Sequence, residues 1–335
     1  MWTIFSEKTD ATHPSGSRRI CGPPSLNSDK AAWQEYNGSM KFLSLLILCA
    51  ATALAQNQAL VEEKSTRVSD HVYAIVGFPN IAIVTGSNAT LVVDTGLGPR
   101  NGATAMRVVK KLSMGQKLFL TTTHFHVEHT TGEAAFPAET ILIRTAVQQE
   151  EAEKGIVAMI ARFSTFSAQN RDLLAGVKLR APDLVFDREA KLDLGGVTAR
   201  LLWYGAGHTK GDELIFVEPD STLIPGDIVQ DKIVPRVNAG EGTPKGWLAI
   251  LDKIAPLKPR YIVPDHGALG DGSLIAKERG FIVDLQSRAL ALKRQGTAVK
   301  DAGQQLTAEF KAKYPDWASM DLVPGFVERV YAEDQ

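Results

Sequence analysis

The chain has 335 residues, of which 44% are hydrophobic and 22% are charged. This is the composition of a globular protein with enough apolar residues for a sizeable core. The formal net charge is -1 at pH 7 and the chain has no long basic run, which argues against a nucleic-acid partner.

The first 55 residues have the features of a leader that is not part of the fold. Residues 1–39 are polar and rich in Ser, Pro and Gly, which predicts a disordered leader or an extension ahead of the true start at Met40. Residues 40–55 then give a basic start, an apolar stretch and Ala53-Leu-Ala55, the pattern of a cleaved signal peptide. The apolar stretch is shorter than the roughly 20 residues of a membrane-spanning helix. An uncleaved N-terminal anchor is the alternative.

We therefore expect a mature protein that starts at Gln56, is periplasmic or secreted, and keeps no stable membrane anchor. Both cysteines, Cys21 and Cys49, lie in the part that we expect to be removed. The mature chain would then have no disulfide, no thiolate metal ligand and no cysteine nucleophile.

Residues 56–335 alternate between β-branched runs and segments with helical spacing. Residues 156–178 are less regular, and the spacing of Ile160, Phe163 and Phe166 favours a helical insertion there. The chain has no internal linker, so we expect a single domain over residues 56–335. The expected strands are 72–76, 81–85, 90–93, 118–123, 141–143, 191–194, 197–203, 213–217, 221–224 and 261–263, and the expected helices are 102–113, 145–155, 245–256 and most of 273–333.

Five of the seven histidines fall in three short motifs. Histidine is the commonest metal ligand because its neutral ring offers a lone pair near pH 7. Several histidines with carboxylates in such spacing are typical of a catalytic zinc site, and two adjacent ions can clamp both sides of a displacement. The motifs are Thr-His124-Phe-His126-Val-Glu128-His129, Gly-Ala-Gly-His208-Thr and Pro-Asp265-His266-Gly.

The residues beside these motifs have simpler interpretations. Asp212 and Asp265 adjoin the histidines, and we expect them to be turn residues or to support the ligands. Phe78 lies in a turn and could cover a substrate or form an ordinary hairpin tip. Phe163 and Phe166 could line a pocket, but aromatic residues at helical spacing are more often in a core.

Together these motifs resemble those of the metallo-β-lactamase superfamily. The resemblance covers most of residues 66–335 and includes Val-Val-Asp94-Thr-Gly, the histidine cluster, the His208 motif, Pro-Gly226-Asp227 and the His266 motif, in the family's order. It implies an α/β fold, a four-layer αβ/βα sandwich with two mixed β-sheets flanked by helices. The metals would lie at the rim between the sheets.

The resemblance also implies a ligand set. His124, His126 and His208 would hold a first metal, and His129 and His266 a second, with Asp227 bridging them and Asp94 as a support. Glu128 stands where the family usually has Asp. Its longer side chain predicts weaker occupancy of the second site, and a shift of the loop that lets Glu128 bind normally is the alternative.

The function implied is that of an exported metal-dependent hydrolase, in which a metal-bound hydroxide cleaves an ester, lactone, thioester or β-lactam bond. Two zinc ions are expected, with iron or manganese also possible, and Glu128 or Asp227 could transfer a proton. The bridging Asp favours the lactonase, thioesterase and glyoxalase II-like branches, whereas export favours a β-lactamase or a lactonase. A mononuclear iron enzyme resembling sulfur dioxygenases and a metal-binding protein without catalysis are the alternatives. The substrate is expected to be a small molecule, and the oligomeric state is not predicted.

Overall fold

The structure of the chain is a computed structural model that describes residues 60–334, all within one compact unit, Thr52–Gln335. The expected leader and signal peptide, residues 1–55, lie outside the described residues. No helix among residues 60–334 combines the length and the apolar character needed to cross a membrane.

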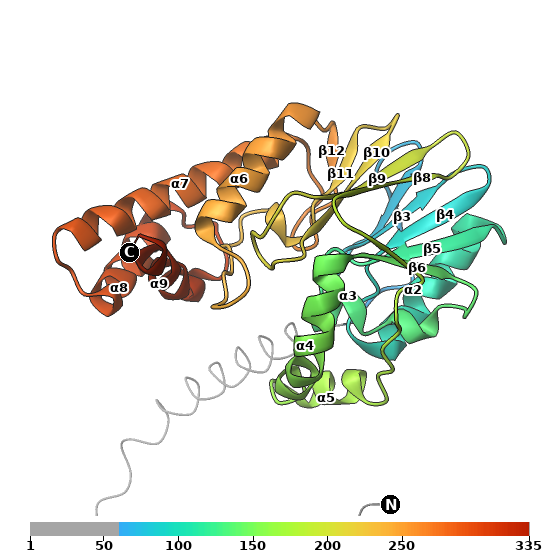
Figure 1. The fold of residues 1–335 in the computed structure, drawn as a ribbon, viewed down its shortest axis with the longest axis horizontal. Helices are drawn as coiled ribbons and strands as arrows, with labels where there is room; N and C mark the ends of the chain where they lie inside the picture. Colours follow the sequence, from blue (N-terminus) through green and yellow to red (C-terminus); the bar gives the residue numbers. More distant parts are fainter. Residues whose placement is uncertain (1–59, 335) are drawn as a thin grey trace, which may run out of the picture. The chain divides into compact units, whose positions relative to one another are not determined.

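Two mixed β-sheets form the centre of the fold (Figure 1). The 7-stranded sheet runs in the order β1-β2-β3-β4-β5-β6-β7, with antiparallel pairs up to β4 and parallel pairs from β4 to β7. The 5-stranded sheet runs β12-β11-β10-β9-β8, and only β11 and β12 are parallel. The strands are β1 (Thr66–Arg67), β2 (Val72–Ile75), β3 (Ile81–Thr85), β4 (Ala89–Val93), β5 (Lys117–Thr121), β6 (Ile141–Thr145), β7 (Leu184–Phe186), β8 (Glu189–Asp193), β9 (Thr198–Trp203), β10 (Glu213–Glu218), β11 (Thr222–Ile224) and β12 (Tyr261–Ile262).

Helices cover the outer face of each of the two sheets (Figure 1). Pro99 in the first turn of α2 and the Thr243 hydroxyl that caps Gly246 N in α6 explain where these two helices begin. Figure 1 shows α2 beside β4–β6, and α6 and α7 beside β10–β12. The α-helices are α2 (Gly98–Ser113), α3 (Val127–Thr130), α4 (Ala146–Phe163), α5 (Ala168–Leu174), α6 (Pro244–Ile254), α7 (Ser273–Arg294), α8 (Val299–Lys313) and α9 (Val323–Glu333), with short 3-10 helices at η1 (Glu133–Ala135), η2 (Gly226–Ile228), η3 (Ala255–Leu257) and η4 (Met320–Leu322).

Alternation along the strands produces three apolar layers. Val84 and Leu91 of the first sheet pack with Ile215 of the second, so the sheets face each other. Ile83, Val92 and Leu120 point the other way and pack against Met106 and Val109 of α2. Leu214, Phe216 and Leu223 of the second sheet pack in the same way against α6, α7 and α9. The expected four-layer αβ/βα sandwich is therefore confirmed.

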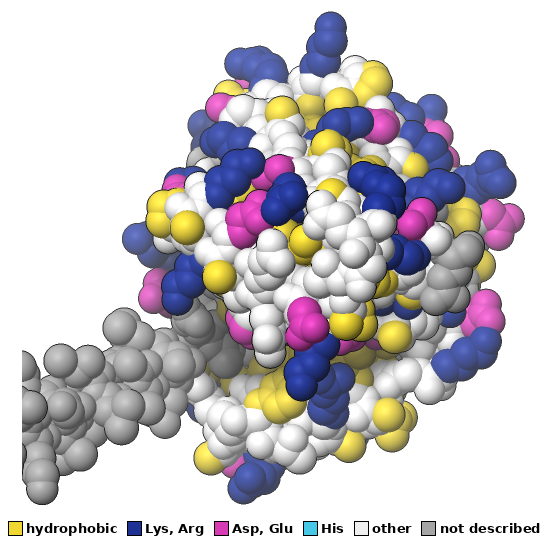
Figure 2. Space-filling view, turned by 90° about the vertical axis from the view of Figure 1, so that its left-hand side faces the viewer, with side chains coloured by type: hydrophobic (Ala, Val, Ile, Leu, Met, Phe, Trp, Pro, Cys, Tyr) yellow, Lys and Arg dark blue, Asp and Glu magenta, His cyan; other side chains and the backbone are white. Residues whose placement is uncertain are grey.

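The C-terminal helices are part of this core. Phe281 of α7 stacks on Trp317 with ring centroids 4.0 Å apart, next to Phe310 and Tyr314. The segment after Trp317 then pairs with the chain after η2, because Ala318 N donates to Lys232 O at 2.8 Å. The tail thus reaches the loops that follow β11. On the face drawn in Figure 2, basic and acidic side chains are intermixed.

Candidate metal centre

The structure brings all seven expected ligands together. They lie in the segments that follow strands: His124 and His126 in the loop after β5, Glu128 and His129 in α3, His208 after β9, Asp227 in η2 after β11, and His266 after β12. Each of the seven side chains is buried. Parallel neighbours end at the same edge of a sheet, which places the segments after β11 and β12 side by side, and Asp227 after β11 contacts both His208 and His266.

His124, His126 and His208 form the first group, with ligand atoms within 4.8 Å of one another. His208 Nδ1 lies 2.8 Å from Arg236 O, and His126 Nε2 lies 3.2 Å from a Glu241 carboxylate oxygen. A carbonyl and a carboxylate can only accept, so these outer ring nitrogens carry the protons. The inner nitrogens, His208 Nε2 and His126 Nδ1, then face each other at 3.2 Å with a lone pair each.

This arrangement fits a metal cation. Two facing lone pairs repel each other unless a cation or an added proton lies between them. His124 Nε2, from the third member of the group, is also buried without a hydrogen-bond partner among residues 60–334. A buried polar atom left in this way costs free energy, and a metal bound by all three rings would remove that cost.

Glu128, His129 and His266 form a second group, again with ligand atoms within 4.8 Å of one another. Glu128 Oε2 and His129 Nε2 are buried and have no hydrogen-bond partner in the described part of the chain. The longer Glu128 side chain therefore reaches the two histidines with which it would share a metal. Its role as a ligand stays a prediction.

Asp227 lies between the two groups, as expected for a bridging residue. Its Oδ2 is 3.3 Å from His208 Nε2 and its Oδ1 is 3.2 Å from His266 Nε2. Although burial alone would raise it, the neighbouring His266 and His208 lower the pKa of Asp227 to about 2. Burial lowers the pKa of His208 to about 4 and the pKa of His124 well below 6.5, so these two rings are neutral near pH 7. Burial also acts to lower the pKa of His126 and His129, but the carboxylates beside them, Glu241 and Asp94, raise it, and a bound metal would displace the added proton.

Three buried aspartates hold the ligand loops. Asp94, at φ 68°, accepts Thr123 N at 2.8 Å and lies 3.1 Å from His129 Nδ1. Asp265 accepts the Thr123 hydroxyl at 2.7 Å and lies 3.3 Å from the same His129 nitrogen. Asp265 also lies close enough to His124 and His129 to form a third possible group. Asp265 contacts His129 through Nδ1, whereas His129 Nε2 has no hydrogen-bond partner among the described residues and is left for a metal, so we assign Asp265 an orienting role.

Asp212 holds the loop of His208. One of its oxygens accepts the backbone N–H groups of Gly207 and His208, each at 2.9 Å, and the other accepts Thr209 N at 2.8 Å. Burial raises the pKa of this carboxyl to about 7. Asp212 and Asp265 were expected to be turn or supporting residues, and both support ligand loops in the structure.

Sequence reasoning missed one further carboxylate that supports a ligand, Glu241. It contacts His126 and is itself held by Asn238 Nδ2, which donates to Glu241 Oε2 at 2.8 Å. Glu241 sits in the sequence Asn-Ala-Gly-Glu-Gly, far from every histidine motif. Its position between two glycines in a polar loop is the one local signal that could have pointed to it.

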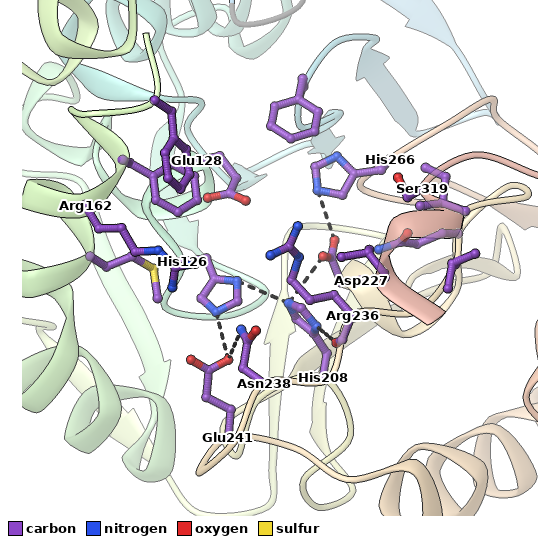
Figure 3. Close-up of a pocket in the computed structure, with 18 of the residues that line it drawn as sticks. His126, Glu128, Arg162, His208, Asp227, Arg236, Asn238, Glu241, His266 and Ser319 are labelled. Atoms are coloured by element: carbon purple, nitrogen blue, oxygen red, sulfur yellow. Dashed lines mark hydrogen bonds and ion pairs between the residues drawn. The ribbon is translucent and has the colours of Figure 1, made fainter. Parts of the chain in front are cut away.

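A cavity of about 350 Å³ opens over the two groups (Figure 3). Phe78 from the turn between β2 and β3 lines it and stacks on His266 with ring centroids 4.3 Å apart. Phe163 and Phe166 line it as well, so these aromatic residues face a pocket as well as packing on their neighbours. The volume is in the range of small-molecule sites.

Comparison with known proteins identifies the family. Residues 74–266 match the family model of the Metallo-beta-lactamase superfamily. The chain belongs to this superfamily. The resemblance seen in the sequence is thereby confirmed, and superfamily members bind divalent metals, which fits the ligand groups described above.

Several known proteins are similar to this superfamily member. The linear primary-alkylsulfatase of Pseudomonas sp. (strain ATCC 19151) is 24% identical over an alignment of 216 residues, and the match covers 55% of this chain and 40% of that protein. This chain therefore spans less than half the length of that relative.

The solved structures of a metallo-beta-lactamase from Pontibacter korlensis and of the sec-alkylsulfatase Pisa1 from Pseudomonas sp. share the fold. The first has a TM-score of 0.53 at 19% identity and covers 66% of this chain and 99% of its own. The second has a TM-score of 0.61 at 14% identity and covers 82% of this chain and 50% of its own. At these identities the likeness establishes the fold alone.

Proposed function

We propose that this protein is a metal-dependent hydrolase that cleaves an ester, lactone, thioester or β-lactam bond in a small-molecule substrate. One observation carries the proposal. Two groups of buried ligands, which share Asp227 between them, form the floor of a cavity large enough for such a substrate. We further propose that the enzyme works outside the cytoplasm, in keeping with the signal-peptide pattern of residues 40–55.

The residues fit a pair of divalent cations, with zinc as the first candidate. His124, His126 and His208 would hold one, Glu128, His129 and His266 the other, and Asp227 would contact both. Such cations, when bound, polarise a substrate oxygen and lower the pKa of water toward neutrality.

The protein's own groups then have distinct tasks. Glu241 holds the His126 ring through Nε2, which leaves Nδ1 free for the first site. Asp227, with a pKa of about 2, stays ionised and is a poor proton acceptor, so its task is to be a ligand. Glu128 also lines the cavity, and besides its task as a ligand it is the better candidate of the two for moving a proton, because Asp227 stays ionised.

The candidate substrates come from two sources, the resemblance of the sequence to the superfamily and the relatives found by comparison. Esters, lactones, thioesters and β-lactams remain candidates from the sequence. The alkylsulfatase relatives add sulfate esters to the series.

Metal analysis and a hydrolase panel test the proposal. The purified protein is analysed for zinc, iron and manganese, then assayed with a chromogenic ester, lactone, cephalosporin and aryl sulfate, with and without chelator. We expect about two zinc ions per chain and turnover of at least one substrate that chelator abolishes. His208→Ala should lose both the activity and one equivalent of metal. One iron per chain with no hydrolysis would contradict the proposal and favour the dioxygenase-like alternative.

A further inference from the structure

Two arginines line the cavity without a carboxylate partner. Arg162, near the end of α4, and Arg236, between η2 and α6, both line the cavity and are exposed. No ion pair within residues 60–334 involves either guanidinium, whereas Arg144, Arg200 and Arg288 each contact a carboxylate. Two unpaired cations in one pocket are available to a ligand.

The two arginines stand on different walls. Figure 3 shows Arg162 on the side of α4 and Arg236 on the opposite side, beside His208. The Arg236 carbonyl accepts His208 Nδ1 at 2.8 Å, so the Arg236 side chain starts directly next to the first ligand group. Arg162 lies over the ring of Phe166, 5.8 Å from its centroid. A ligand in the cavity would therefore meet a guanidinium from either side.

Apolar side chains surround these cations. Met159 and Phe163 lie four residues apart on α4 and line the cavity with Arg162. Phe166 follows the end of α4 and lines the cavity too. Phe166 is 57% exposed, a large apolar surface for a free monomer to leave open. The opposite wall is apolar too, through Ile233, Val234 and Leu322.

This opposite wall depends on the C-terminal tail. Val234 N donates to Ala318 O at 3.2 Å, and Leu322 ends the short helix η4. Both tail residues lie beyond residue 266, where the family match ends. Ile233 and Val234 lie within the matched region, so the tail completes and supports a wall that this region begins.

The carboxylates that line the cavity do not neutralise the positive charges of Arg162 and Arg236. Asp227 contacts His208 and His266, and Glu241 contacts His126 and Asn238. Glu128 groups with two of the histidines. All three carboxylates are thus engaged at the ligand groups, and the two guanidiniums are left to a ligand.

We propose that the cavity binds an organic anion with an apolar body. Its anionic group, a sulfonate, sulfate or carboxylate, is bound by Arg236 with help from Arg162, and its apolar part lies against the walls of Phe163, Phe166 and Leu322. A guanidinium offers paired donors in the geometry that such oxyanions accept. The inference rests on the proposed function for the place of the reacting bond, but recognition of the anion needs no catalysis.

Binding of a non-hydrolysable probe to the full chain tests this inference. Octane-1-sulfonate carries both features, 1-octanol lacks the charge and methanesulfonate lacks the apolar body. The affinity of each is measured by calorimetry, with excess chelator present so that metal ions contribute nothing. We expect octane-1-sulfonate to bind at least tenfold more tightly than either of the other two compounds.

Variants identify the binding site. Arg236→Gln should weaken octane-1-sulfonate binding at least tenfold, the effect of losing a charged hydrogen bond, and Arg162→Gln should weaken it less. Arg188→Gln is the matched control, since Arg188 is also exposed but lines a different cavity. Thermal unfolding of each variant verifies that it is folded, and Arg236→Lys should restore part of the affinity.

Two results would overturn the inference: equal binding of 1-octanol and octane-1-sulfonate, or equal effects of Arg236→Gln and Arg188→Gln. Failure of the proposed function would look different. If the protein binds octane-1-sulfonate through Arg236 but hydrolyses nothing in the panel, the inferred anion site stands and the proposed hydrolase function is contradicted.

Discussion

Glu128 is the residue in which this chain departs from the family's usual aspartate, and it belongs only to the second ligand group. We expect Glu128→Gln to lower the affinity of the second metal at least about tenfold, because a neutral amide is a much weaker ligand than a carboxylate. Titration of the metal-free protein with Zn²⁺ measures both sites. Glu128→Asp is the matched control, since it keeps the charge and shortens the side chain. Two equally tight sites in Glu128→Gln would remove Glu128 from the ligand set.

Glu241 supports a ligand: it accepts a hydrogen bond from His126 Nε2, on the opposite side of the ring from the Nδ1 that faces the first metal site. Removing such an orienting group typically costs 10–100-fold in metal affinity. We expect Glu241→Ala to weaken the binding of the first metal by roughly this factor. Glu241→Gln can still accept the hydrogen bond from His126 Nε2 and should lose less affinity. Competition with a chromophoric chelator gives the affinities. Glu139→Ala removes an exposed carboxylate and should change nothing. An unchanged first site in Glu241→Ala would show that His126 needs no partner.

Glu213 in β10 is buried, and burial raises the pKa of its carboxyl to about 8 from 4.5. The Thr121 hydroxyl lies 2.9 Å from Ile143 O and 2.6 Å from Glu213 Oε1. A hydroxyl has one proton, which the carbonyl needs, so a protonated Glu213 completes the arrangement. The folded protein thus holds this proton more tightly than the unfolded chain does.

Stability should therefore fall as the pH rises from about 4.5 to about 8, on account of Glu213. We expect Glu213→Gln to remove this fall, which is on the order of a few kcal/mol in the free energy of unfolding. Urea unfolding at pH 5 and pH 8 gives the difference, with Glu62→Gln on the surface as the control. If both variants follow the wild-type pH dependence, Glu213 is not protonated in the fold.

At this scale, the sequence predicted the ligands better than their supports. His124, His126 and His129 follow one strand at short spacing, so their convergence needs only a single local turn. Glu241 and Arg236 reach the site from a loop without a motif, and only the packed fold brings them to His126 and His208. Contacts of this kind leave no pattern in one sequence.

Among the elements, the longer strands and helices were predicted, as were the edge strands β8 and β12, but the two edge strands of the 7-stranded sheet, β1 and β7, were not. β7 (Leu184–Phe186) was missed because an edge strand of this length has no alternation, and both Leu184 and Val185 are exposed. α2 begins at Gly98 and not at residue 102, because Pro99 opens the helix. The insertion over 156–178 is helical as expected, shared between α4 and α5. The pairing of the two sheets depends on which apolar faces meet, which no single strand encodes.

The aromatic stack of the tail should control one wall of the cavity. Trp317 lies on Phe281 and is followed by Ser319 and Leu322, which line the cavity. We expect Trp317→Ala to lower the free energy of unfolding by about 2–3 kcal/mol, because a partly buried ring is lost, and to weaken octane-1-sulfonate binding. Trp317→Phe keeps a ring and should have smaller effects. If the Trp317→Ala protein is destabilised but binds octane-1-sulfonate as tightly as the wild type, the aromatic stack does not control this wall of the cavity.

For the molecule as a whole, the family match ends at residue 266 but the core does not. Phe281 and Phe326 of the tail pack in one cluster with Leu214 and Leu223 of the second sheet. The tail is thus integral to the fold, although the histidine motifs that reveal the family all precede it. That one catalytic domain spans residues 56–335 stays a prediction.

The start of the mature chain is the last prediction. Val61 is buried, its N–H donates to Asn101 Oδ1 at 3.0 Å, and its side chain packs in the layer under α2. A chain cut before Gln56 keeps these contacts, so signal-peptide cleavage after Ala55 leaves the described fold whole. We expect the intact mass of exported protein to match a chain that begins at Gln56, and a recombinant chain with that start to unfold at the same temperature as a longer one. A mature N-terminus well before Gln56, or a clear loss of stability in the shorter chain, would show that residues 1–55 belong to the working protein.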